Sequence, residues 1–226
     1  MRGKIISIEG GDRVGKHTQS LLLQQWLIDQ DIEAKQFSFP NYGTDQSQPV
    51  ENYLAGKFGK LDPMEASVLY AFDRSVTLRE EKINLFLDNG GWVVFDRYVQ
   101  SNMMYQTARH LPDDIDLTTI DTYDNTFIEK LSQLEFDILG LPKPDMIIYL
   151  DLDRKFNDIL LNKDLGKNGG DIHERDHGLL DKASIVGSLI ARDYGWNRII
   201  CNDENGIFSI EDIHKNIIKE VEPLLP

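Results

Sequence analysis

Hydrophobic positions along the chain gather into short continuous runs that alternate with longer stretches of helical spacing. Apolar runs of strand length occur at residues 4–9, 34–39, 92–96, 145–151 and 198–202. Helix-like stretches lie between them at residues 16–30, 63–89, 101–109, 118–139, 178–195 and 210–222. Strands that are apolar throughout and separated by helices are typical of a parallel sheet covered on both faces. The pattern therefore predicts an α/β fold with helices on both faces of a parallel sheet.

The first predicted strand runs into a glycine-rich turn, which is followed by the start of a helix. This strand–turn–helix context is the one that a phosphate-binding loop requires. Glycines let the backbone curl so that successive N–H groups point at one anion, and the helix start adds the positive end of its dipole. A glycine-rich turn without a ligand is the alternative. The candidate ATP-binding residues are Gly10, Gly11, Asp12, Arg13, Val14, Gly15, Lys16, His17 and Thr18.

The third predicted strand ends in a carboxylate, Asp96, which is followed by Arg97. Beside a phosphate-binding loop, such an acid can hold Mg²⁺ or accept a proton from an attacking oxygen. Arg97 would offer a planar pair of donors to a second phosphate. The alternative is a structural role, in which the two side chains neutralise each other or cap the next helix. Asp151 ends the fourth strand in the same way, but nothing basic or aromatic flanks it, and we interpret it as structural.

Composition narrows the classes of partner. The chain has 226 residues, which fits one large α/β domain spanning residues 1–226, and a formal net charge of −14. That charge argues against nucleic acid and anionic membranes as partners, but a local cluster of arginines can still bind a small anion. We interpret the one cysteine, Cys201, as a core residue, since it falls in the last predicted strand. We find neither the pattern of a secretory leader nor an apolar run long enough to span a membrane, and we therefore expect a cytoplasmic protein.

Segments spread along the chain resemble one known family. Residues 10–19, 39–44, 70–74 and 96–106 occur in the order found in thymidylate kinases, and residues 171–176 resemble the segment after that family's lid. The resemblance implies a P-loop kinase with a five-stranded parallel sheet and a mobile lid at about 162–175. It also implies transfer of the γ-phosphate of ATP, with Mg²⁺, to dTMP to give dTDP. By resemblance we further expect a homodimer formed through helices near residues 63–89 and 101–109.

On the donor side, the resemblance assigns the β- and γ-phosphates to Lys16 and to the backbone of residues 11–18. Arg13 matches the branch of the family that supplies its transition-state arginine from the phosphate loop rather than from the lid. The sequence agrees with that division, because no arginine lies between Lys155 and Glu174. A solvated loop arginine is the alternative for Arg13. The expected catalytic residues are Arg13, Lys16, Asp96 and Arg97.

On the acceptor side, Tyr70 matches the residue that stacks on thymine, and Arg74, one helical turn later, would reach a carbonyl oxygen of the base. Without the family, Tyr70 would be interpreted as core. Asn102 matches a residue that hydrogen-bonds the pyrimidine edge, and Tyr105 matches the aromatic that crowds a 2′-hydroxyl. Arg97 and Tyr42 would face the acceptor phosphate, whereas Ser101 and Gln106 could simply cap a helix or face solvent. The expected acceptor-binding set is Asp12, Tyr42, Tyr70, Arg74, Arg97, Ser101, Asn102 and Tyr105.

Two features depart from the family pattern. His17 occupies the position where a serine or threonine hydroxyl usually binds Mg²⁺ after the P-loop lysine. We expect His17 to lie beside the phosphates, and we name Asp96 as the metal ligand, with Asp12 and Glu174 as further candidates. The second departure is the lid, whose residues 162–170 match no family pattern closely. The lid candidates are Lys163, Lys167, Asp171, His173 and Glu174.

Two other functions remain open at this point. A kinase of the same fold could act on another deoxynucleotide, such as dUMP, or on a deoxynucleoside such as thymidine. A more remote alternative is a P-loop nucleotide switch that is not a kinase. Guanine-reading switches need Asn-Lys-x-Asp after a strand, and the nearest match, residues 162–165, ends in Leu165 and follows a helix.

Overall fold

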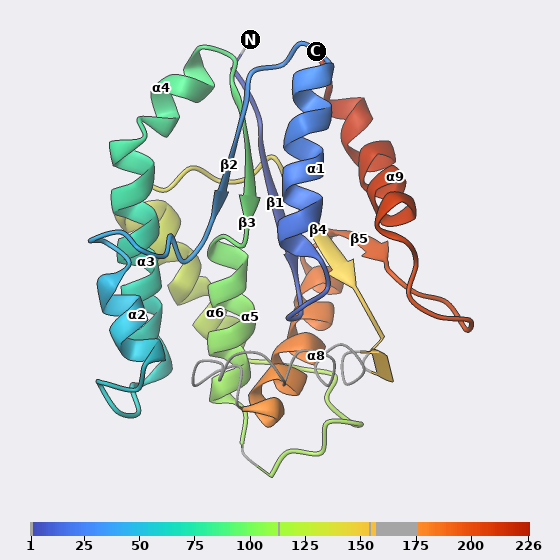
Figure 1. Cartoon of the computed structure of the whole chain (residues 1–226). Coiled ribbons are helices and arrows are strands. Elements are labelled where there is room, and N and C mark those ends of the chain that lie inside the picture. The colour runs from blue at the N-terminus through green and yellow to red at the C-terminus, as the bar shows by residue number, and fades with distance from the viewer. Residues whose placement is uncertain (1, 113, 154, 157–175) are drawn as a thin grey trace.

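A computed structural model of the chain describes residues 2–112, 114–153, 155–156 and 176–226 (Figure 1). Five parallel strands form one sheet in the order β2-β3-β1-β4-β5. The predicted parallel sheet is therefore confirmed. The strands are β1 (Ile5–Gly10), β2 (Ala34–Ser38), β3 (Trp92–Asp96), β4 (Met146–Asp151) and β5 (Asn197–Ile200).

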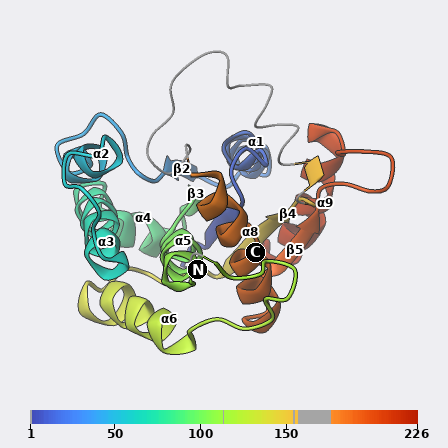
Figure 2. The ribbon, with the colours of Figure 1, turned by 90° about the horizontal axis from the view of Figure 1, so that it is seen from below.

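Helices cover both faces of this sheet, as the apolar runs predicted. Figure 2 shows α1 on one side of the strands and α5 with α6 on the other. Successive side chains of a strand point to opposite faces. Ile5, Val93 and Phe95 therefore join the core beneath α5, whereas Ile6 and Val94 join the core beneath α1 and α9. The helices are α1 (Lys16–Asp29), α2 (Gln48–Leu54), α3 (Pro63–Glu80), α4 (Ile83–Asp88), α5 (Val99–His110), α6 (Asn125–Ser132), α8 (His177–Asp193) and α9 (Ile210–Val221).

Local signals account for where several helices begin. Asp62 accepts a hydrogen bond from the backbone of Met64, and the side chain of Glu65 accepts one from the backbone of Asp62. This reciprocal pair forms a capping box before α3, with Pro63 at the first helical position. Ser209 caps α9 in a similar way through the backbone N–H of Asp212.

Two helix predictions were wrong in detail, and one helix was missed. The stretch 63–89 is two helices, because Lys82 adopts a left-handed backbone with φ of 53° and redirects the chain so that Ile83 and Leu87 enter the core. The stretch 118–139 becomes helical only at Asn125, and its end is a π-helix, η1 (Gln133–Ile138). The short α2 was not predicted. The other predicted elements agree to within two residues at each end.

Two further expectations concern single features of the chain. Cys201 is buried, as predicted, and burial raises the pKa of its thiol to about 12. Within the described ranges, no helix combines the length and the apolar content that crossing a membrane requires. The predicted lid at residues 162–175 lies outside the described residues.

Candidate active site

The glycine-rich turn connects the carboxyl end of β1 to the amino end of α1. Gly10 and Gly15 have positive φ values of 144° and 92°, and Gly15 is the residue that precedes the first turn of α1. Glycine adopts this region at little cost, which explains why the turn needs glycine there. The amino group of Lys16 is buried under the turn and donates a hydrogen bond to the carbonyl of Gly11. Val14 packs into the core below, so the loop is anchored from both sides.

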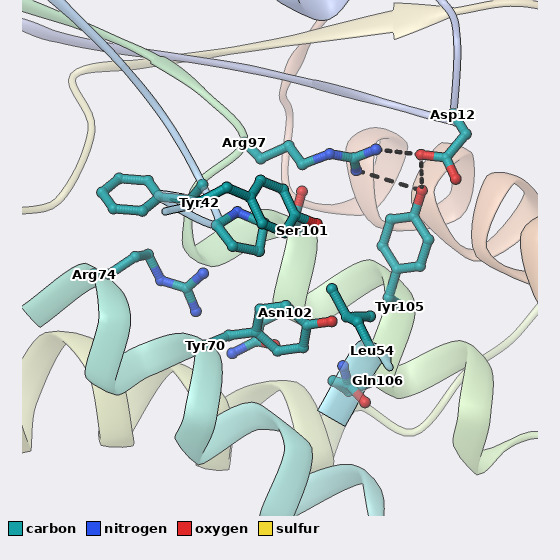
Figure 3. A pocket seen from close by; sticks show the side chains of 12 residues that line it. Asp12, Tyr42, Leu54, Tyr70, Arg74, Arg97, Ser101, Asn102, Tyr105 and Gln106 are labelled. Atoms are coloured by element: carbon teal, nitrogen blue, oxygen red, sulfur yellow. Dashed lines mark hydrogen bonds and ion pairs between the residues drawn. The ribbon is translucent and has the colours of Figure 1, made fainter. Parts of the chain in front are cut away.

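Arg97 approaches the same turn from the end of β3. Its guanidinium forms an ion pair with Asp12, and the hydroxyl of Tyr105 donates to Oδ1 of Asp12 at 2.9 Å (Figure 3). Burial acts to raise the pKa of Asp12, but the positive charges of Arg97 and Lys16 lower it to about 2. Asp12 is therefore a carboxylate at any physiological pH. Arg97 pairs with the phosphate loop, not with the neighbouring Asp96 as in the structural alternative.

Lys16 has an unusual electrostatic environment. Burial and the nearby charge of Arg97 lower its pKa to about 8, although Asp12, Asp96 and Glu9 act in the opposite direction. Two cations held close together in a partly dry site are poorly solvated, and a bound anion relieves that cost. The arrangement favours a phosphate between Lys16 and Arg97.

Asp96, at the end of β3, lies beside His17, an exposed residue in the first turn of α1. Its Oδ2 accepts a hydrogen bond from the hydroxyl of Ser38 at 3.2 Å and lies 3.3 Å from Nδ1 of His17. His17 is thus next to the loop, as expected, and Thr18 is exposed. In the part of the chain that the structure describes, no group of three or more His, Cys, Asp or Glu side chains could hold a metal ion.

A pocket opens directly beside the phosphate loop, between α3 and α5. All eight residues predicted to bind the acceptor line it, and Figure 3 shows their side chains converging on it from separate parts of the chain. Gln106 also lines it, as do Phe39 and Pro40 from the family motif at residues 39–44. Leu54, which the sequence did not single out, completes the lining. Asp12 belongs both to the phosphate loop and to this pocket. The structure therefore joins the two predicted half-sites through one side chain.

The polar end of the pocket rests on a buried ion pair. Arg74 donates through Nε and Nη2 to the two carboxylate oxygens of Glu135, at 2.7 and 2.6 Å. Only 2% of the Arg74 side chain and none of the Glu135 side chain is exposed. Asn102 donates to Oε1 of Glu135 at 2.8 Å and to the carbonyl of Ser67 at 3.1 Å. Burial acts to lower the pKa of Arg74, but the charge of Glu135 raises it above its usual value.

Comparison with known proteins identifies the family. The family model described as thymidylate kinase matches residues 8–158, which include the phosphate loop and every residue that lines the pocket. The chain belongs to the thymidylate kinase family. It is therefore a nucleotide-binding phosphotransferase, and the alternative of a nucleotide switch falls away.

Individual relatives of this family extend the match to nearly the full chain. The chain is 32% identical to a thymidylate kinase from Clavibacter sepedonicus, over 88% of this chain and 90% of that protein. It is 29% identical to a thymidylate kinase from Plasmodium falciparum (isolate 3D7), over 97% and 90%. A solved thymidylate kinase from Candida albicans superimposes with a TM-score of 0.70 at 22% identity, covering 99% of this chain and 92% of that one. This last likeness confirms the P-loop kinase fold.

Sequence reasoning missed Glu9, which is completely buried in β1. Its carboxylate accepts hydrogen bonds from Ser7 at 2.8 Å, from the backbone of Tyr98 at 2.7 Å and from Ser101 at 2.6 Å. Burial raises the pKa of Glu9 even though these hydrogen bonds act to lower it. Glu9 therefore ties β1 to the start of α5 and holds Ser101 in the pocket. The available signal was a lone charged residue in a strand that is otherwise apolar, since such a charge needs partners.

Glu135 was missed for a related reason. It lies one helical turn after Leu131, on the face of the predicted helix that packs inward. A glutamate at an inward position is the signal that could have marked it. The lid candidates Lys163, Lys167, Asp171, His173 and Glu174 lie outside the described residues and stay predictions.

Proposed function

We propose that this protein transfers the γ-phosphate of ATP to dTMP and releases ADP and dTDP. The observation that carries the proposal is the shared side chain, Asp12, at the junction of the phosphate loop and the acceptor pocket. A kinase must hold two nucleotides end to end, with their phosphates meeting at one point. Here that point lies between Lys16 and Arg97.

Phosphoryl transfer asks the protein to position and neutralise two anions, with little covalent chemistry of its own. Lys16 and the loop backbone hold the outer phosphates of ATP. Arg97, oriented by Asp12 and Tyr105, binds the acceptor phosphate through donors that the ion pair leaves free. Arg13 stabilises the charge that develops on the transferring group.

The remaining pocket residues select the acceptor. Tyr70 offers its ring to the base, while Arg74 and Asn102 offer polar atoms to the edge of the base. Tyr105 lies on the side of Asp12, where the sugar would pass toward the phosphate. This order of residues along the pocket fits base, deoxyribose and phosphate in sequence.

The residues present also fit a Mg²⁺ ion that travels with ATP. In kinases this ion needs only one or two carboxylates, because phosphate oxygens and water supply its other ligands. Asp96 would hold it, since its carboxylate borders the loop and, among the residues that the structure describes, contacts Ser38 at 3.2 Å and His17 at 3.3 Å. Asp12 is less suited, because Arg97 and Tyr105 already use it. Bound Mg²⁺ neutralises charge on the phosphates.

A coupled assay of ADP release tests the proposal. Mg·ATP is offered with dTMP, dUMP, dCMP, dGMP or thymidine, and we expect the highest kcat/KM with dTMP. Highest turnover with thymidine or another deoxynucleotide would assign the protein to that acceptor. Absence of turnover with every acceptor would contradict kinase activity. The matched control is Lys16→Ala, which must abolish the signal if it comes from this site.

The proposal also covers the domain organisation, location and oligomeric state of the protein. Residues 1–226 act as one domain in the cytoplasm, and the net charge of −14 disfavours nucleic acid and membranes as partners. The chain forms a homodimer through α3, whose outer face exposes Val68 at 48% and Phe72 at 49%, one turn apart. The second expected dimer element, residues 101–109, stays a prediction; in the chain itself, α5 packs between α3 and α8.

A further inference from the structure

A fully buried carboxylate, Glu135, lies behind the two polar side chains that the pocket presents to a base. It lies in η1, a π-helical turn. Such turns are rare in proteins, and those that occur are often found at functional sites. We propose that Glu135 is a positioning residue that makes the pocket show a hydrogen-bond donor beside an acceptor. It thereby favours a pyrimidine with a C4 carbonyl and an N3–H over one with a C4 amino group and a bare N3. This inference rests on the proposed function.

The hydrogen bonds of Asn102 determine which atom it can offer. A primary amide has two N–H donors and one carbonyl acceptor. Both donors are used inside the protein, one on Ser67 and one on Glu135. Oδ1 is then the atom that Asn102 has available for the pocket, and it can only accept.

Arg74 is fixed by the same carboxylate. Its Nε and Nη2 are engaged by Glu135, which leaves Nη1, a donor, for the pocket. Figure 3 shows the Arg74 side chain extending from α3 into the pocket toward Tyr70 and Asn102. Because Arg74 and Glu135 are almost completely buried, their mutual pairing is strongly favoured over any arrangement that leaves one charge alone.

The resulting pattern matches one class of base. Thymine and uracil present a carbonyl oxygen at C4, which can accept from Arg74, and an N3–H, which can donate to Asn102. Cytosine presents the reverse, an amino group at C4 and an unprotonated N3, so that donor would face donor and acceptor would face acceptor. Sites built to hydrogen-bond one pattern reject the opposite one strongly, because buried polar groups are left unpaired.

The test compares dTMP with 5-methyl-dCMP, which keep the same methyl group and differ at C4 and N3. Dissociation constants are measured by calorimetry for the wild-type chain and for Glu135→Gln. We expect the wild type to prefer dTMP about 10²-fold or more, and Glu135→Gln to reduce that preference at least tenfold. Glutamine keeps the size of the side chain, but its one accepting oxygen can replace only Oε1. Its NH2 group would then face Nε of Arg74, donor against donor, so Arg74 and Asn102 are no longer held in their present orientation. With saturating dTMP, kcat should change less than KM.

The control is Asp137→Asn, an exposed residue of the same π-helical turn, which should keep the wild-type preference. If Glu135 only supports folding, Glu135→Gln will weaken both nucleotides equally, and the unchanged ratio overturns the inference. Where Glu135→Gln does not fold, Glu135→Asp replaces it and must also lower the ratio. A wild-type chain that binds both nucleotides equally well overturns the inference too. If the wild type bound dTMP selectively but did not turn it over, the proposed function would be contradicted and the inference about Glu135 would stand.

Discussion

Arg13 and Arg97 share a strained backbone. Their φ values are 61° and 66°, in the left-handed region that residues with a Cβ avoid at a cost of about 1–2 kcal/mol. Such strain persists where surrounding contacts over-determine the conformation, and it gathers at functional sites. For Arg97 those contacts are the ion pair with Asp12 and the ring of Tyr105, whose centroid lies 5.3 Å from the guanidinium carbon. Both strained residues are ones to which we assign phosphate contacts.

Replacing Arg13 tests its role at the transition state. We expect Arg13→Ala to lower kcat by about 10³-fold or more while raising the KM for ATP much less, because the arginine acts on charge that develops during transfer. Steady-state kinetics with varied ATP measures both constants. The control is Arg2→Ala, which should leave kcat unchanged. Arg2 is exposed and precedes β1, whose opposite end leads into the phosphate loop. Turnover of Arg13→Ala close to that of the wild type would refute this role.

Tyr105 offers a test of sugar selection. We expect Tyr105→Ala to reduce the preference for dTMP over its ribose analogue by about tenfold, because removal of the ring makes room for a 2′-hydroxyl. Ratios of kcat/KM for the two nucleotides measure it. Tyr105→Phe keeps the ring and loses the hydrogen bond to Asp12, so it should keep the preference. An Ala variant with the wild-type ratio would argue against steric selection by this ring.

The low pKa of Lys16 predicts a pH dependence of ATP binding. Burial and Arg97 lower that pKa to about 8, so in the free enzyme the amino group is charged below pH 8 and neutral above it. We expect the affinity for ATP to be full below this pH and to fall as the pH rises through it, since a neutral amine attracts phosphate weakly. Titration calorimetry between pH 7 and pH 10 follows the loss. A Lys16→Arg variant that binds ATP should show no decline there, whereas a flat wild-type profile would contradict the assignment.

At the scale of elements, the order of the strands creates the site. β1 and β3 are neighbours, with Ile8 beside Asp96, so the loops after them meet at one edge of the sheet. The helices that follow take opposite faces, since α1 packs on one core and α5 on the other. A crevice opens where successive connections leave in opposite directions, and ligands of open α/β sheets bind there. Asp12 and Arg97 meet in this crevice.

The pairing of β1 with β3 depends on a close backbone approach at Gly3. A Cβ at this position would lie 1.8 Å from the carbonyl oxygen of Gly91, a backbone atom that cannot move aside alone. We expect Gly3→Ala to lower the free energy of unfolding by about 3 kcal/mol, at the upper end of overpacking effects. Urea denaturation measures it.

The matched control is Gly178→Ala in the first turn of α8, where the nearest atom to a new Cβ is 3.4 Å away. Its stability should stay within about 0.5 kcal/mol of the wild type. Equal stability of the Gly3 and Gly178 variants would show that the approach at Gly3 is not tight in solution.

At the scale of the whole molecule, the sign of the net charge differs from the sign of the charges that would bind the phosphates. The chain carries a net charge of −14, yet Lys16, Arg74 and Arg97 gather around one pocket. Buried or partly buried charges are screened by salt much less than surface charges are, so these nearby cations act on a bound anion more strongly than the distant acidic surface does. An acidic surface is therefore compatible with an anion-binding site.

The exposed apolar residues of α3 predict the assembly. We expect the wild type to sediment as a dimer at micromolar concentration, and the double variant Val68→Asp, Phe72→Asp to sediment as a monomer, because two charges cannot be buried in an apolar contact. Leu21→Asp, at an apolar residue of α1 that is 43% exposed, is the control and should leave the dimer intact. A monomeric wild type would remove the proposal.

Much of the fold follows from local pattern, and the site follows from it only in part. The strands were predictable because their apolar runs are continuous, and the clustering of eight predicted residues in one pocket because they lie in motifs with fixed spacing. The break at Lys82 was not, because it is decided by where Ile83 and Leu87 find room in the core. Nor was the partner of Arg74, which lies 61 residues away in the chain.

By itself, the sequence determined the class of fold, the phosphate loop and the family, since each is written in short segments whose chemistry needs neighbours only a few residues away. Only the tertiary structure decided that Arg97 pairs with Asp12 and that Glu9 and Glu135 are buried behind the pocket. Those contacts join residues 61 to 92 positions apart. Their energies depend on burial and on exact partners, which no local pattern encodes, because the cost of a buried charge is set by whatever the rest of the chain brings beside it.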